Sequence, residues 1–110
     1  FAEMLRNRGM AGEKRILEDK WIAEMQSPQL APALMNEKVN QGLGVRGIAG
    51  DGYPWLPVGS YGWSGVYGTH FWVDPVNGIT AIYMKNSRYD GGSGALTGKH
   101  FEEDVFNAIV

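Results

Sequence analysis

The sequence predicts an α+β fold, an antiparallel sheet with flanking helices, and three observations support this prediction. Sixteen glycines and five prolines are many for 110 residues. Most of them fall between residues 42 and 98, which is typical of a turn-rich β region. Residues 61–84 contain two apolar runs separated by a turn sequence, the pattern of a hairpin. Apolar residues at helical spacing mark both ends of the chain.

The first part of the chain is expected to be helical. Residues 1–8 place apolar side chains on neighbouring turns, and Gly9 is suited to end that helix. Residues 18–27 predict a second helix, with acidic side chains at its start and a proline directly after it. Residues 29–40 show little periodicity and are interpreted as a linker. Residues 1–40 therefore form a helical segment with its linker.

Residues 41–110 are expected to hold antiparallel strands and a C-terminal helix. A strand is predicted near residues 43–46, ahead of the hairpin. The second hairpin strand, residues 79–84, is apolar on both faces, which favours a central position in the sheet. Residues 101–110 carry one apolar stripe at helical spacing. Three strands and one helix would leave a sheet face uncovered and prone to association.

Composition excludes several classes of function. The formal net charge is −2 with acidic and basic residues interleaved, so no basic surface for nucleic acid is expected. Cysteine is absent and the two histidines are far apart, so neither a metal site nor a cofactor is predicted. No apolar run approaches the roughly 18 residues of a membrane span. The lack of cysteine does not decide the compartment.

Residues 61–75 read YGWSGVYGTHFWVDP, and this pattern resembles a strand and hairpin of the serine β-lactamase and penicillin-binding-protein superfamily. Residues 4–17 and 25–28 are similar to the same superfamily in matching order. The resemblance is strongest to its class C-like branch of esterases, D-aminopeptidases and D-Ala-D-Ala carboxypeptidases. It implies the C-terminal part of the serine β-lactamase-like fold and a hydrolase of the esterase, amidase or D-Ala-D-Ala peptidase type.

The resemblance also implies a substrate-binding wall. The family's Lys-Thr-Gly triplet corresponds here to Trp63, Ser64 and Gly65. Ser64 would offer a hydroxyl to the substrate, and Gly65 would let the substrate backbone lie close to the strand. The backbone N–H of Val66 would be one donor of the oxyanion hole. Because Trp63 carries no positive charge, ester or amide hydrolysis is expected rather than efficient β-lactam hydrolysis.

The nucleophile that the family would require is missing. In the family it lies in a Ser-x-x-Lys motif, yet no serine of this chain is followed three residues later by lysine, and no Tyr-x-Asn occurs. The chain also begins in what reads as the middle of a helix. We therefore expect a C-terminal segment that is inactive alone. Its partner would be the N-terminal remainder of the parent hydrolase, or a second copy, and its substrate a small ester, amide or peptide.

A second interpretation is a non-catalytic binding or interaction module that uses an aromatic strand surface. His70 is expected to be structural or surface-exposed, because it stands alone among aromatic residues. The acidic cluster Glu102, Glu103 and Asp104 is explained by its place in the first turn of the last helix.

Overall fold

The computed structural model describes residues 1–109. Its elements in chain order are α1 (Ala2–Arg6), β1 (Met10–Ala11), β2 (Lys14–Arg15), α2 (Asp19–Gln26), a short 3₁₀ helix η1 (Pro32–Leu34), β3 (Val39–Gln41), β4 (Arg46–Ile48), β5 (Tyr61–Ser64), β6 (His70–Asp74), β7 (Ile79–Tyr83) and α3 (Leu96–Ile109).

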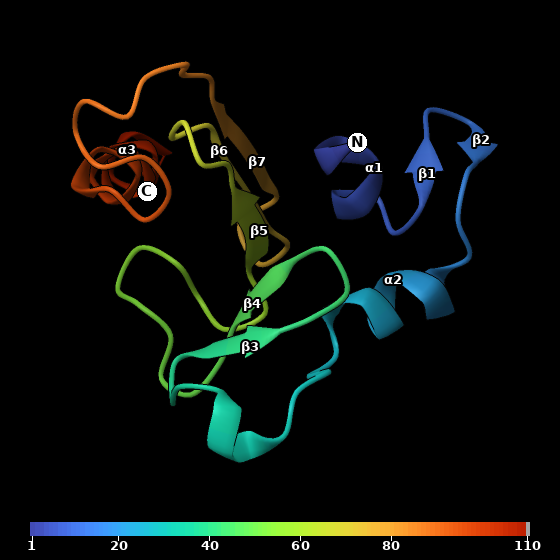
Figure 1. The fold of residues 1–110 in the computed structure, drawn as a ribbon. Coiled ribbons are helices and arrows are strands. Elements are labelled where there is room, and N and C mark those ends of the chain that lie inside the picture. Colours follow the sequence, from blue (N-terminus) through green and yellow to red (C-terminus); the bar gives the residue numbers. More distant parts are fainter. Residues whose placement is uncertain (110) are drawn as a thin grey trace.

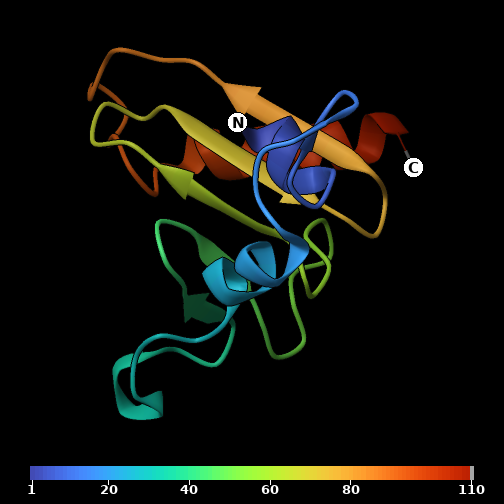
Figure 2. The same cartoon turned by 90° about the vertical axis from the view of Figure 1, so that its right-hand side faces the viewer.

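The centre of the fold is a five-stranded antiparallel sheet with the order β3-β4-β5-β6-β7. Figure 1 shows this sheet between α3 on one side and α1 on the other. Figure 2, turned by 90°, shows α1 in front of the sheet and α3 behind it. The predicted α+β architecture of an antiparallel sheet with flanking helices is confirmed.

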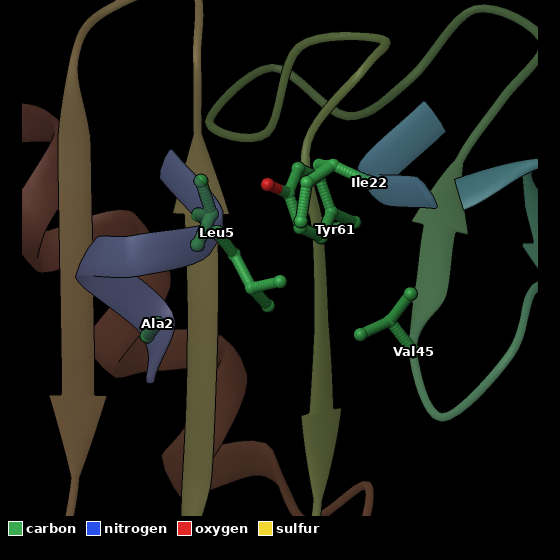
Figure 3. Close-up of a cluster of buried hydrophobic side chains, with 6 residues drawn as sticks. Ala2, Leu5, Ile22, Val45 and Tyr61 are labelled. Carbon is green, nitrogen blue, oxygen red and sulfur yellow. The ribbon is translucent and has the colours of Figure 1, made fainter. Parts of the chain in front are cut away.

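The α1 face of the sheet carries one buried cluster (Figure 3). Leu5 of α1 and Ile22 of α2 pack against Tyr61 of β5, and Val45 and Val73 complete the cluster. Leu5, Val45 and Val73 are almost completely buried, and each fully buried aliphatic side chain contributes about 1.5–3 kcal/mol. Burial raises the pKa of the Tyr61 hydroxyl to about 12, so this side chain is a neutral phenol at ordinary pH.

A polar contact at the edge of α1 ties it to β7. The Thr80 hydroxyl donates to the Glu3 carboxylate at 2.9 Å, and the Arg6 guanidinium pairs with the same carboxylate. The hydrogen bond from Arg6 is the largest cause that lowers the pKa of Glu3 to about 2. Glu3 is therefore ionised throughout the pH range in which most proteins are folded.

The α3 face carries a second cluster. Trp72 and Ala81 of the sheet pack against Leu56 of the long β4–β5 connection. Phe101 and Val105 of α3 pack against the same group, and the Trp72 and Phe101 rings meet edge to face at 5.4 Å. Each face of the sheet thus has its own helix, and the prediction of a three-stranded sheet with a single covering helix is wrong.

Several strand boundaries differ from the prediction. Residues 61–73 form two strands, β5 and β6, because a tight turn at residues 65–68 interrupts the run. The strand predicted near residues 43–46 is found at β4, since residues 42–45 form a turn in which the Gly42 N–H bonds the Val45 carbonyl. β3 begins inside the segment interpreted as a linker.

The predicted position of the hairpin's second strand is also wrong. β7 lies at the edge of the sheet and pairs only with β6 among the described strands. Ile79 and Ala81 are buried on the α3 face, but Ile82 is 54% exposed on the other face. β7 therefore has apolar side chains on both faces although only its α3 face is buried.

The C-terminal helix starts five residues earlier than predicted. Gly98 lies inside its first turn. Because glycine is a poor helix former, the sequence did not indicate that the helix includes this turn. Val110 lies outside the described residues. None of the helices in residues 1–109 is long and apolar enough to cross a bilayer.

Candidate functional site

The residues predicted to form the substrate wall lie at the end of β5 and in the turn after it. β5 pairs with β6 along its whole length, but with β4 only at Tyr61 and Gly62. Past Gly62, the β4 side of this strand therefore has no strand neighbour within residues 1–109. An open strand edge can pair with an extended ligand.

Trp63 and Ser64 point to opposite faces of the sheet, as successive strand residues do. Trp63 stands opposite Phe71, which belongs to the cluster on the α1 face, and Trp63 is 44% exposed. Ser64 stands opposite His70, which faces α3. The structure thus brings the indole and the hydroxyl to one end of β5 but to different sides of it.

Gly65 and Val66 begin a β-turn. The Gly65 N–H donates to the Thr69 carbonyl at 2.7 Å, and the Gly68 N–H donates to the Gly65 carbonyl at 2.9 Å. Tyr67 has a negative φ, so Val66 and Tyr67 are the central residues of a type I turn. The Val66 N–H donates to no acceptor in the described part of the chain, and Val66 is 58% exposed.

Ser64 is the first member of a hydrogen-bonded chain that crosses from the sheet to α3. Its Oγ lies 2.8 Å from Nδ1 of His70, and Nε2 of His70 lies 2.6 Å from Oε1 of Glu102. The second carboxylate oxygen of Glu102 accepts from the Trp55 indole N–H at 3.3 Å. His70 also stacks on Trp72, with ring centroids 5.6 Å apart.

Residue types and spacing in the sequence did not indicate this hydrogen-bonded series of side chains. His70 is buried, at 7% exposure, so the expectation that it lies at the surface is wrong. Glu102 is buried as well, unlike Glu103, so its position in the helix does not account for it. One signal was available, because Glu102 falls on the buried stripe of α3 that also contains Val105.

A cavity of about 230 Å³ lies beside these hydrogen-bonded side chains, between the sheet and α3, and is called the α3-side cavity. Ser64, His70 and Glu102 are among its polar lining residues, and Trp55 and Leu56 contribute an apolar wall. Buried polar groups that converge on an apolar cavity are the usual mark of a small-molecule site.

A family model for beta-lactamases matches residues 3–100. The chain belongs to the beta-lactamase family. The match includes the candidate residues Trp63, Ser64, Gly65 and Val66 and ends just before Glu102.

Among the solved structures similar to this beta-lactamase-family chain is EstCE1, described as a hydrolase with promiscuous acyltransferase activity. The TM-score is 0.74 at 24% sequence identity, and the alignment covers 96% of this chain but 27% of EstCE1. The chain therefore spans about a quarter of that protein's length. No curated protein matched the sequence.

Within residues 1–109, no three His, Cys, Asp or Glu side chains come together in a group that could hold a metal ion. His70 and Glu102 are paired with each other and with Ser64 and Trp55. The chemistry that these residues can offer is hydrogen bonding and proton transfer.

Proposed function

We propose that this chain is the C-terminal, substrate-side segment of a β-lactamase-like serine hydrolase that acts on esters or amides. The observation that carries the proposal is the end of β5. There the strand has an open edge, the Trp63 indole is exposed, and the Val66 N–H donates to no acceptor within residues 1–109.

Each residue at this end of β5 has a role in the proposal. Trp63 is a flat apolar wall for the substrate, and Ser64 is a polar contact. Gly65 has no side chain to hold the substrate away, and a Cβ built there would meet only Thr69, at 3.7 Å. The Val66 N–H stabilises the oxyanion that forms during acyl transfer. The activity described for EstCE1 is also acyl transfer chemistry, which supports this class of reaction.

The nucleophile and its base would come from sequence outside residues 1–110, because the chain has no Ser-x-x-Lys and no Tyr-x-Asn. The α1 face supports such a partner. Phe1, Ile82 and Met84 are large apolar side chains left 54% to 77% exposed. The N-terminal remainder of the hydrolase would cover them, and a second copy of the chain is the other candidate partner.

A second candidate function is that Ser64 is itself a nucleophile, with His70 as its base and Glu102 orienting the imidazole. The distances of 2.8 and 2.6 Å fit such a triad. However, serine hydrolases commonly use the N–H of the residue after the nucleophile in the oxyanion hole. Here that N–H belongs to Gly65 and donates to the Thr69 carbonyl, so we favour the first candidate.

Assay of the 110-residue chain with a chromogenic short-chain ester and with a cephalosporin separates the two candidates. We expect no hydrolysis above the rate of a Ser64→Ala control, because the chain has no activated family nucleophile. Turnover that survives purification, is blocked by a serine-reactive probe and disappears in Ser64→Ala would replace the first candidate by the second.

A further inference from the structure

Glycines form part of the lining of the α3-side cavity. Four of its lining residues are Gly68, Gly92, Gly94 and Gly98, contributed by the β5–β6 turn, the loop before α3 and the first turn of α3. A Cβ built at Gly98 would meet only the His70 ring, at 3.9 Å, an ordinary contact distance. A Cβ is therefore sterically permitted at Gly98, and the absence of a side chain there leaves space in the cavity.

The cavity is large enough for a small organic molecule. Its volume is about 230 Å³, whereas an engineered apolar cavity of about 150 Å³ in another protein binds benzene. Trp55, Tyr53, Leu56 and Ile48 give it an aromatic and aliphatic wall. An aryl or branched alkyl group would bury its apolar surface against these side chains.

The polar wall of the cavity favours a ligand that donates a hydrogen bond. An ionised Glu102 can only accept, so Nε2–H of His70 and the Trp55 indole N–H both donate to it. When the His70 ring is neutral, its Nδ1 accepts a hydrogen bond from the Ser64 hydroxyl. In that tautomer Ser64 Oγ keeps acceptor capacity alone, and a ligand that meets it donates an O–H or N–H.

The charged side chains that line the cavity have both signs. The carboxylate of Glu102 lies in the polar wall, and Arg46 and Lys99 also line the cavity. Charge therefore selects neither an anion nor a cation, and an uncharged molecule can bind through a hydrogen bond and apolar contact alone.

From these observations we infer that the α3-side cavity binds a small uncharged alcohol or amide, whose O–H or N–H donates to Ser64 Oγ while its apolar group packs on Trp55 and Leu56. If the proposed function holds, this ligand is the alcohol or amine portion of the ester or amide substrate. The binding itself rests on the cavity alone and does not require that the chain belong to an active hydrolase.

The test is a titration of the 110-residue chain with benzyl alcohol, and with toluene as the matched ligand that lacks the hydroxyl. Binding is followed by the indole N–H signal of Trp55 in ¹H–¹⁵N NMR spectra, assigned with a Trp55→Phe variant. One hydrogen bond changes affinity by roughly 3- to 10-fold, so toluene should bind weaker than benzyl alcohol by that factor. Ser64→Ala should bind the two ligands equally.

Gly98→Leu tests the location. Leucine favours a helix more than glycine does, so this variant should fold while its side chain fills the cavity, and benzyl alcohol should no longer shift the Trp55 signal. Gly98→Ala serves as the smaller substitution, and Asn107→Leu, on an exposed position of α3, is the matched control that should bind as the wild type does.

Three results would overturn the inference: no shift of Trp55 by benzyl alcohol, equal affinity for toluene in the wild type, or undiminished binding in both Gly98 variants. None of these results bears on hydrolysis. The failure of the cavity inference and the failure of the proposed function can therefore be told apart.

Discussion

Replacing Val66 with proline is expected to lower ester turnover by the proposed parent hydrolase, the longer polypeptide that would contain this chain, by about 10²- to 10³-fold. The substitution removes one backbone N–H, which is the proposed donor to the oxyanion. Val66 is the second residue of a type I turn, a position that proline favours. The backbone conformation should therefore be preserved while the donor is lost.

The control is Val66→Ala, which keeps the N–H and removes most of the side chain. It should leave turnover within a few-fold of the wild type. Thermal unfolding of the 110-residue Val66→Pro chain should show no loss of stability, because proline at a compatible position restricts the unfolded chain. Wild-type turnover in Val66→Pro would remove Val66 from the site.

Glu102→Leu is expected to lower the free energy of unfolding of the chain by about 2–4 kcal/mol. The carboxylate accepts from both His70 and Trp55, and leucine would leave both donors without an acceptor in a largely buried place. Urea unfolding, followed by tryptophan fluorescence, measures the change.

Two further variants separate this effect from a change in packing. Glu102→Gln keeps one acceptor oxygen and should lose less stability. The double variant Glu102→Leu with His70→Leu removes a donor together with its acceptor, and it should recover part of the loss of Glu102→Leu. A Glu102→Leu variant within about 0.5 kcal/mol of the wild type would contradict the hydrogen-bonded chain.

The sheet and its flanking helices could be predicted because their signals are local. The turn from Asp74 to Gly78 consists of residue types that favour turns. The Asp74 carboxylate accepts hydrogen bonds from the backbone N–H groups of Val76 and Asn77. The order of the strands could not be predicted in the same way. Burial of β7 depends on which elements lie beside it, and residue types within one strand do not specify its neighbours.

In the candidate site, too, the residues that are adjacent in sequence could be predicted and those brought together by packing could not. Trp63, Ser64, Gly65 and Val66 are consecutive, so a short sequence pattern was enough to single them out. His70 and Glu102 are 32 residues apart, and their pairing depends on how α3 packs on the sheet. Neither residue type nor local spacing carries that information.

The central claim is that this chain supplies the substrate side of a serine hydrolase and not its nucleophile. The most direct measurement is to label the longer polypeptide and the isolated 110-residue chain with a fluorophosphonate probe, and to locate the adduct by mass spectrometry. We predict one modified serine outside residues 1–110 in the longer polypeptide and no adduct on the isolated chain. An adduct on Ser64, or no adduct in an esterase-active longer polypeptide, would contradict the account.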